Sequence, residues 1–394
     1  MNKHILVEAV QDYINMHLHD DVNQIALSKS PFPDVNSAEL ANQITAKKKS
    51  EKKLPTWFST DNIYYPPALS IEQTSSEATA QYKAGLAIPG KLLDLTGGFG
   101  VDSFYFSKVV DEVTHAEINE TLSDIAAYNA GVLGRNNIRF EAKDGFAVLT
   151  NSKNHYNTIY IDPARRSEKG KVFMLKDCTP DVPSHLPQLL ASTDRIIVKT
   201  APLLDLTAGF SELDQVSAVH IVSVKNECKE LLWVIDKDFT GSPEIVAVTL
   251  NEQIKTFSFF KPEDQADPKL IDECAPGAFI YEPDAALLKS GAFDLIGNRY
   301  DLKKLHTQTQ LYYSETLKTD FPGRIFRLNE LRSTSELKKE KTLSANVIVR
   351  NYPAKAEELI RKYKIKSSKD EFLIFTKLTG NRNVVLKSEI VQYY

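Results

Sequence analysis

The 394-residue sequence predicts an α/β protein with a helical N-terminal region and small α+β domains at its C-terminal end. Three observations predict this class. Between residues 91 and 238, short β-branched or apolar runs alternate with helix-length segments, which is typical of right-handed βαβ units and a parallel sheet. The last two of these runs are too close for a crossover helix and predict an antiparallel hairpin at the sheet edge. The residues after 330 have the order strand, helix, strand, strand, which is typical of one helix packed on a small sheet.

The N-terminal region is predicted to be helical because apolar residues recur there on one helical face, at Leu6, Val10, Ile14 and Leu18. The lysine-rich run 47–53 is expected to be a solvated helix end or a linker, with a nucleic-acid contact as the alternative. A further helix is expected from Glu72 to Gly85.

Seven strands are predicted for the large sheet. Five are expected to be parallel, at 91–95, 112–116, 138–141, 158–161 and 195–200, and the hairpin strands are 218–225 and 230–236. Further strands are expected at 245–250, 256–260, 310–314, 323–328, 346–350, 371–377 and 383–389, with helices at 284–295 and 354–363. The predicted domains are therefore 1–85, 86–240, 241–330 and 331–394.

The charge is divided unevenly along the chain. The 48 basic and 52 acidic residues give a formal net charge of −4. Residues 331–394 contain 14 basic and 7 acidic residues, a local net charge of +7, which leaves −11 for residues 1–330. A basic C-terminal domain is expected to contact nucleic-acid phosphates, with Arg350, Arg361 and Lys362 as candidate substrate-binding residues. The alternative is a solvated basic helix.

Cysteine and histidine patterns exclude several classes of site. The cysteines Cys178, Cys228 and Cys274 have no C-x-x-C spacing, which argues against a disulfide framework and a thiolate zinc site. The eight histidines form no HExxH pattern, so chemistry without a metal is expected. No stretch approaches the roughly 20 apolar residues of a membrane span, and the N-terminus is too polar for a signal peptide. A cytoplasmic protein without a membrane partner is therefore expected, and its oligomeric state stays open.

A glycine-rich loop follows the first predicted strand. The strand ends in Asp94, and the loop contains Thr96, Gly97, Gly98 and Gly100. Glycines allow a sharp turn into a helix whose free N–H groups face a ligand, which is typical of a nucleotide-type cofactor site. A dinucleotide-binding loop would have a third glycine at Ser103 and no carboxylate at Asp94. Asp94 suits a ligand with an ammonium group, such as S-adenosylmethionine; an ordinary turn is the alternative.

Acidic residues follow three further predicted strands. Glu117 lies 19 residues beyond Gly98, where a ribose diol needs an acceptor, and Asp144 suits an adenine amino group. Asp162 ends the fourth strand. Because ligands of such sheets bind outside the carboxyl ends of the strands, these acids and Asp94 are expected to converge on one crevice.

The fourth strand continues into Pro163, Ala164, Arg165 and Arg166. Proline favours an extended Asp162, and the arginines are expected to face the crevice, where a guanidinium suits phosphate or carboxylate. The alternative for either arginine is a surface ion pair. Lys199, at the end of the fifth strand, is suited to a substrate phosphate or to proton removal.

These motifs resemble the class I S-adenosylmethionine-dependent methyltransferases, and more closely the bacterial members with a THUMP-like C-terminal domain. The resemblance covers most of the chain and rests on residues 70–84, 94–100, 162–166, 281–287 and 349–353. It implies a Rossmann-like seven-stranded methyltransferase sheet, a ferredoxin-like segment and an RNA-directed accessory domain. It also implies that the glycine loop with Asp94 holds the methionine part of the cofactor, Glu117 the ribose and Asp144 the adenine.

By the same resemblance, the helix start with Gln73, Ser75 and Ser76 lines the cofactor or substrate entrance, and Asp162 and Pro163 lie beside the reacting methyl group. The sequence departs from the amino-group methyltransferases, which have proline and an aromatic residue where Ala164 and Arg165 stand. This departure argues against N6-adenine-type chemistry. Carbon-5 pyrimidine methylation needs a cysteine nucleophile, for which Cys228 is the candidate and a small partly buried hydrophobe the favoured alternative.

The leading hypothesis is a methyltransferase that acts on structured RNA, either tRNA or rRNA. Small-molecule methylation, with Arg165 and Arg166 binding a carboxylate, and a catalytically silent module that binds the cofactor and RNA are the alternatives. An NAD-dependent oxidoreductase is disfavoured by Ser103 and by the terminal hairpin.

Overall fold

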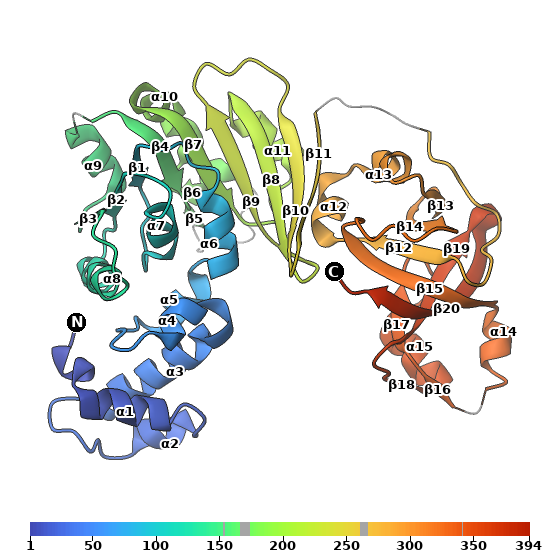
Figure 1. Cartoon of the computed structure of the whole chain (residues 1–394), viewed down its shortest axis with the longest axis horizontal. Helices are drawn as coiled ribbons and strands as arrows, with labels where there is room; N and C mark the ends of the chain where they lie inside the picture. Colours follow the sequence, from blue (N-terminus) through green and yellow to red (C-terminus); the bar gives the residue numbers. More distant parts are fainter. Residues whose placement is uncertain (153, 166–173, 261–266, 341) are drawn as a thin grey trace. The chain divides into compact units, whose positions relative to one another are not determined.

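The computed structural model describes residues 1–152, 154–165, 174–260, 267–340 and 342–394, without the side chain of Arg165. The chain divides into two compact units (Figure 1). Unit 1 comprises residues 1–217 and 232–241, and unit 2 comprises residues 218–231 and 242–394. Each unit is described by itself.

Unit 1 begins with short helices that follow a 3₁₀ turn at Lys3–Leu6. They are α1 (Glu8–Met16), α2 (Val22–Leu27), α3 (Ser37–Lys53), α4 (Pro55–Ser59), α5 (Ala68–Gln73) and α6 (Glu77–Ala84), blue in Figure 1. Val10 and Ile14 of α1 are buried against Leu40 and Ile44 of α3, as the apolar spacing predicts.

The lysine-rich run is the last part of α3 rather than a linker. Lys47 is only 6% exposed, and its Nζ donates to Asn15 Oδ1 at 2.6 Å. Lys49 forms an ion pair with Glu72. The expectation of a solvated segment is therefore wrong for Lys47, because its side chain is buried against Asn15 of α1.

The helix expected from Glu72 to Gly85 is interrupted. Helix α5 ends at Gln73 and α6 begins at Glu77, with the Ser76 side chain accepting the N–H of Thr79 as the N-cap. A serine that caps a new helix satisfies a backbone donor that a continuous helix would use internally. The break places residues 74–76 in a loop.

The parallel strands of unit 1 confirm the predicted βαβ pattern. They have the order β7 (Thr193–Thr200), β4 (Tyr156–Ile161), β1 (Lys91–Asp94), β2 (Glu112–Ala116) and β3 (Ile138–Glu141). The intervening helices are α7 (Val101–Phe106), α8 (Glu120–Val132), α9 (Gly145–Asn151), α10 (Val182–Ser192) and α11 (Leu206–Glu212). Two short strands, β5 (Ala164–Arg165) and β6 (Cys178–Thr179), pair with each other after β4, and a 3₁₀ turn spans Leu175–Asp177.

The hairpin is present as β8 (Val216–Val224) and β9 (Glu227–Asp236), but its predicted place at the sheet edge is wrong. The strand order is β11-β10-β8-β9-β7-β4-β1-β2-β3. Strand β10 (Glu244–Leu250) pairs in parallel with β8, and β11 (Ile254–Phe260) pairs antiparallel with β10. All residues of β10 after Glu244 are buried, which is typical of a strand covered on both faces. The seven predicted strands are therefore extended to nine.

Unit 2 also contains a seven-stranded sheet. Its order is β13 (Lys303–His306), β14 (Thr309–Ser314), β12 (Phe279–Pro283), β15 (Gly323–Arg332), β20 (Arg382–Gln392), β19 (Glu371–Leu378) and β17 (Asn346–Val349). Helices α12 (Ala285–Ser290), α13 (Phe293–Arg299), α14 (Thr334–Leu337) and α15 (Ala356–Tyr363) accompany it, with a 3₁₀ turn at Thr379–Asn381. Two short strands, β16 (Leu343–Ser344) and β18 (Ile365–Lys366), pair in parallel.

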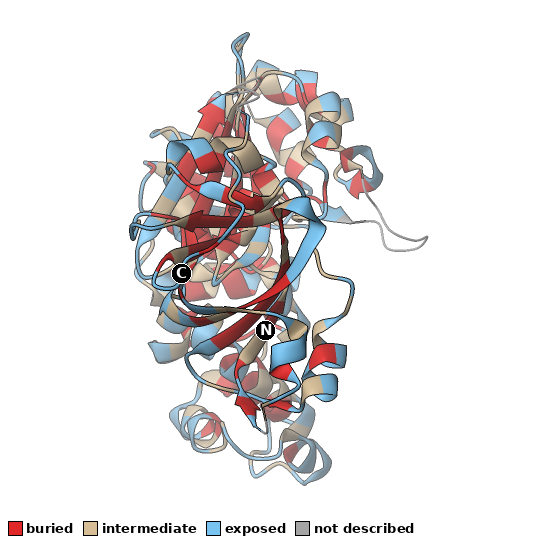
Figure 2. Ribbon diagram, turned by 90° about the vertical axis from the view of Figure 1, so that its right-hand side faces the viewer, coloured by how far each residue is buried: buried red, intermediate tan, exposed pale blue. Residues whose placement is uncertain are grey.

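The last residues do not form a sheet of their own. Strand β15 pairs with β12 on one side and with β20 on the other, so one sheet spans the predicted boundary at residue 330. Alternate residues of β19 separate two apolar cores: Phe372 and Ile374 face one, and Leu373 and Phe375 face the other, which contains Leu359 of α15. Figure 2 shows buried residues concentrated on strands. Removing residues 331–394 would delete the core that contains Leu359, expose the other core and leave β15 without β20.

Candidate cofactor and catalytic site

A cavity of about 470 Å³ lies in unit 1 at the carboxyl ends of β1, β2 and β4. Binding cavities for small molecules commonly have volumes of about 300–1,000 Å³. The lining includes the predicted residues Gln73, Ser75, Thr96, Gly97, Gly98, Glu117, Asp144 and Asp162. The crevice expected from the strand-end acids is thus present as a cavity.

The glycine loop is held against its neighbours in a way that requires glycine. A side chain at Gly97 would place its Cβ 2.0 Å from the His115 ring of β2, and the Gly97 N–H donates to Ala116 O at 2.8 Å. Gly98 and Gly100 have φ values of 55° and 84°, in the left-handed region that favours glycine. Gly100 is the N-cap of α7 and lies behind the cavity lining.

Asp94 is fully buried behind the loop rather than among the residues that line the cavity. Its Oδ2 accepts the Ser103 hydroxyl at 2.6 Å, and its Oδ1 accepts the Thr96 N–H at 3.1 Å. Burial raises the pKa of Asp94 to about 7, although the hydrogen bond from Ser103 opposes the shift. In this position Asp94 braces the loop; its predicted contact with the cofactor stays a prediction.

Glu117 and Asp144 line the cavity with carboxylates that backbone groups orient. Glu117 accepts the N–H of Gly98 at 2.9 Å and that of Asn119 at 2.8 Å. Asp144 is the N-cap of α9 and accepts the Ala147 N–H at 3.0 Å. A Cβ at Gly145 would lie 2.4 Å from Leu95 O, so the start of α9 is pressed against the strand-one loop.

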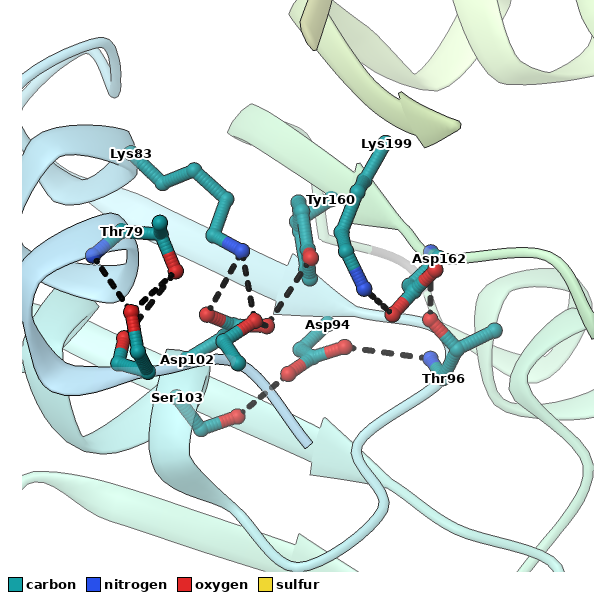
Figure 3. A network of polar contacts seen from close by, with 11 residues as sticks. Thr79, Lys83, Asp94, Thr96, Asp102, Ser103, Tyr160, Asp162 and Lys199 are labelled. Carbon is teal, nitrogen blue, oxygen red and sulfur yellow. Dashed lines mark hydrogen bonds and ion pairs between the residues drawn. The ribbon is translucent and has the colours of Figure 1, made fainter. Parts of the chain in front are cut away.

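Asp162 and Lys199 form an ion pair at the end of β4 and β7 (Figure 3). The Asp162 N–H also donates to Thr96 Oγ1 at 2.7 Å, which ties the fourth strand end to the glycine loop. Lys199 and the buried Pro163 do not belong to the cavity lining, whereas Asp162 does. The Lys199 amine is therefore a cationic partner of Asp162 in this geometry.

A second polar network borders the same cavity, and its key residues were not predicted. Lys83 Nζ lies 2.6 Å from Ser75 Oγ and 3.0 Å from Asp102 Oδ1 (Figure 3). Asp102 Oδ2 accepts hydrogen bonds from Ser75 Oγ at 2.8 Å and from Tyr160 Oη at 2.9 Å. Burial alone would raise the pKa of Asp102, but the charges of Lys83 and Lys199 outweigh it and the pKa is lowered.

The sequence contained a signal for one member of this network. Lys83 lies inside the motif 70–84 that carried the family resemblance, and Asp102 lies two residues after the motif 94–100. Sequence spacing gives no sign that they meet, because the two motifs are separated along the chain by β1.

The remaining predicted site residues lie elsewhere. Ser76 caps α6 and is not in the cavity lining. Arg166 and the side chain of Arg165 lie outside the described residues. In unit 2, Arg361 and Lys362 are exposed on α15, and Arg350 forms an ion pair with Glu282.

The geometry gives little support to Cys228 as a nucleophile. Burial raises its pKa to about 12, with Asp284 and Glu230 adding to the shift and Lys289 opposing it. A thiol with so high a pKa is rarely present as the nucleophilic thiolate at neutral pH.

The part of the chain that the structure describes contains no group of three or more His, Cys, Asp or Glu side chains placed to hold a metal ion. Among the same residues, no helix is both long and apolar enough to cross a membrane.

The sheet order, with five parallel strands followed by the β8–β9 hairpin and a cavity at the strand ends, is that of a methyltransferase-type α/β fold. A solved structure of a candidate methyltransferase from Porphyromonas gingivalis W83 is similar over 100% of both chains, with 29% identity and a TM-score of 0.87. Family models described as a ferredoxin-like domain and a THUMP-like domain match residues 279–322 and 323–388. The resemblance noted in the sequence motifs is confirmed: the chain joins a methyltransferase-family fold to ferredoxin-like and THUMP-like C-terminal domains.

Two more distant structures are also similar. An rRNA methylase from Streptococcus thermophilus matches 41% of this chain and 94% of its own, with 12% identity and a TM-score of 0.30. A candidate methyltransferase from Streptococcus mutans, solved with SAH, matches 41% of this chain and 96% of its own, with 12% identity and a TM-score of 0.31. These likenesses are too weak to add to the assignment. Comparison with curated proteins found no match.

Proposed function

We propose that this protein is an S-adenosylmethionine-dependent methyltransferase that acts on structured RNA, such as tRNA or rRNA. The observation that carries the proposal is the cavity in which the glycine loop, Glu117, Asp144 and Asp162 meet. Its residues fit the cofactor: the loop carries backbone N–H groups, and carboxylates stand at the ends of three strands.

S-adenosylmethionine supplies, when bound, a methyl group on a positively charged sulfur that an electron-rich substrate atom can attack. Glu117 would bind the ribose hydroxyls, since two backbone N–H groups already hold its carboxylate at the cavity wall. Asp144 would contact the adenine side. The Gly97–Gly98 turn would hold the methionine part, in a position that Asp94 braces through Thr96.

Asp162 is proposed as the residue nearest the chemistry. Lys199 holds its carboxylate through the ion pair, and Thr96 holds its backbone N–H. A carboxylate oriented in this way can position a substrate N–H or O–H and accept its proton as the methyl bond forms. Lys199 would act through Asp162 in this arrangement, as a positioning residue.

RNA is proposed as the substrate class because the chain ends in a THUMP-like domain with a strongly basic composition. Residues 331–394 carry a net charge of +7, and positive surfaces bind nucleic-acid backbones with little sequence preference. Arg361 and Lys362 are proposed contacts, since both are exposed on α15.

Calorimetry with S-adenosylmethionine and NAD tests the cofactor. We expect binding of the former and about ten-fold weaker binding by Glu117→Gln, because a charged acceptor is lost. Glu120→Gln, an exposed change of equal charge in the first turn of α8, should bind like wild type. Equal affinities for the two variants would refute the role of Glu117.

Radiolabelled cofactor incubated with total RNA and, separately, with a small-molecule extract tests the reaction. Both should come from a strain that lacks the protein. Label in RNA supports the proposal, and label in the small-molecule extract alone supports the small-molecule alternative. Cofactor binding without label in either fraction indicates a silent binding module.

A further inference from the structure

Two motifs that are far apart in the sequence meet at one buried carboxylate in unit 2. Glu282, from the motif 281–287, is only 1% exposed. Its Oε2 lies 2.6 Å from Nε and 2.5 Å from Nη2 of Arg324, and its Oε1 lies 2.6 Å from Nη2 of Arg350, in the motif 349–353. We call these three residues the Glu282 triad.

Strand register explains why the triad forms. Glu282 and Arg324 are direct cross-strand partners of β12 and β15. Ile280, Phe326 and Ile348 stand two residues from Glu282, Arg324 and Arg350, and all three belong to one apolar core. Because alternate residues share a face, the core face of the sheet ends in the charged triad.

The triad contains one arginine more than is needed to neutralise the charge of Glu282. A buried carboxylate needs a partner, and Arg324 alone supplies two donors to it. With Arg350 the triad has a net charge of +1. Each guanidinium has five N–H groups. Among the described contacts, Arg324 donates one hydrogen bond to Glu282 from Nε and places Nη2 at ion-pair distance, while Arg350 places Nη2 at ion-pair distance from Glu282 and donates one hydrogen bond to Val349 O.

A cavity of about 470 Å³ lies beside both arginines. Its wall contains Arg324, Arg350, the residues of β17, Ala356, Phe372 and Tyr393. Tyr393 is 43% exposed, and its ring meets that of Phe372 edge-on, with the ring centroids 6.4 Å apart. Guanidinium groups beside an exposed aromatic ring are a combination that binds a nucleotide, with phosphate on the arginines and a base on the ring.

We propose that this cavity is a phosphate-binding site for RNA, in which Glu282 fixes Arg324 and Arg350 toward a backbone phosphate. The nature of the ligand rests on the proposed function, while the site itself rests on the triad and the cavity. The surrounding net charge of +7 in residues 331–394 favours a nucleic acid over an acidic protein segment.

The test uses the full chain and fluorescein-labelled total tRNA, with binding measured over a KCl titration. Arg350→Gln should bind about ten-fold more weakly and lower the slope of log affinity against log salt by about one, as expected for one lost phosphate contact. Arg327→Gln is the matched control: it removes the same charge from an exposed residue of β15 outside the cavity wall, and should change affinity less than two-fold.

Folding is checked by circular dichroism and thermal melting. If Arg350→Gln does not fold, Arg350→Lys keeps a cation beside Glu282 but loses the planar fork of donors. It should weaken tRNA binding while the salt slope stays as in wild type. Wild-type affinity in whichever of the two variants is used overturns the proposal. Equal losses in the Arg350 variant and Arg327→Gln also overturn it.

Competition and catalysis separate this site from the proposed function. Adenosine monophosphate should displace tRNA from wild type; displacement by polyglutamate alone would assign the cavity to acidic protein segments and overturn the RNA site. Binding of tRNA that depends on Arg350, without any methyl transfer to RNA, would refute the proposed reaction and leave the site standing. Methyl transfer to RNA together with unaltered tRNA binding in Arg350→Gln would support the proposed reaction and refute the phosphate site.

Discussion

The Nζ atom of Lys83 lies 3.0 Å from Oδ1 of Asp102, although the lysine side chain has no exposed surface. This ion pair joins α6 to α7 at the wall of the cavity, and Ser75 bonds to both partners. The entrance segment and the glycine-loop helix are thus held together by one buried charge pair, which makes the cavity wall sensitive to either residue.

Replacing Lys83 should therefore cost much more stability than replacing a surface lysine. Lys83→Met leaves the Asp102 carboxylate without its nearest cation, and we expect a loss of about 3–5 kcal/mol in the free energy of unfolding measured with urea. Lys91→Met, at an exposed position of β1, should change it by less than about 0.5 kcal/mol. The double variant Lys83→Met with Asp102→Asn should recover part of the loss. Equal costs for Lys83→Met and Lys91→Met would contradict the buried pair.

Asp94 should make the stability depend on pH. Its pKa is about 7 in the folded chain against an ordinary 3.8, so between about pH 4 and 7 the folded protein holds a proton that the unfolded chain has lost. The free energy of unfolding should fall as pH rises through this window and level off above it. Relative to Asp94→Asn, wild type should lose stability from pH 5 to pH 7.5 in urea titrations, and parallel curves would exclude the shift. Asp111→Asn, at an exposed position, is the control and should run parallel to wild type.

His115 should act in the opposite sense. Burial lowers its pKa from 6.5 to about 3. Below pH 6.5 the histidine is therefore protonated in the unfolded chain but stays neutral in the folded chain. Stability is lost as pH falls through this window, and in wild type the Asp94 effect offsets it between about pH 4 and 6.5. Asp94→Asn should therefore lose stability on acidification more steeply than wild type, which the same titrations will show. A stability of Asp94→Asn that does not fall as the pH is lowered from 6.5 to 4 would contradict a neutral buried histidine.

Gly97 should tolerate no side chain. Gly97→Ala would place its Cβ against the His115 ring, and we expect a loss of at least about 2 kcal/mol in unfolding free energy together with loss of S-adenosylmethionine binding. Gly131→Ala, in α8 with open space around its Cβ, should be neutral or stabilising by about 0.5–1 kcal/mol. Similar melting temperatures for the two variants would show that the loop can move away from His115.

Thr96 should be needed for its hydroxyl. Thr96→Val removes the acceptor of the Asp162 N–H and should cost about 1–3 kcal/mol of stability and weaken cofactor binding, whereas Thr96→Ser keeps the oxygen and should resemble wild type. Denaturation and calorimetry on the two variants check this. A valine variant with wild-type affinity and stability would show that another group can satisfy the Asp162 backbone.

The sequence predicted most strands of the large sheet and the convergence of its strand-end residues. Glu117, Asp144 and Asp162 each follow a short apolar run, and parallel strands bring their carboxyl ends to one edge. It did not predict that β10 and β11 extend this sheet. An apolar run such as 245–250 indicates a buried strand but does not indicate which strand it pairs with. Nor did it predict β12 and β13, which are short and contain Pro283 or lysines.

By itself the sequence determined what depends on local order along the chain: strand and helix periodicity, the glycines of the loop, and the basic composition of the last residues. Only the tertiary structure decided which charged residues are buried together. Lys83 with Asp102, and Glu282 with Arg324 and Arg350, meet because separate strands and helices pack side by side. The identity of a charged residue does not indicate whether it faces water or a buried partner. Its burial is set by contacts between segments that are distant in the chain.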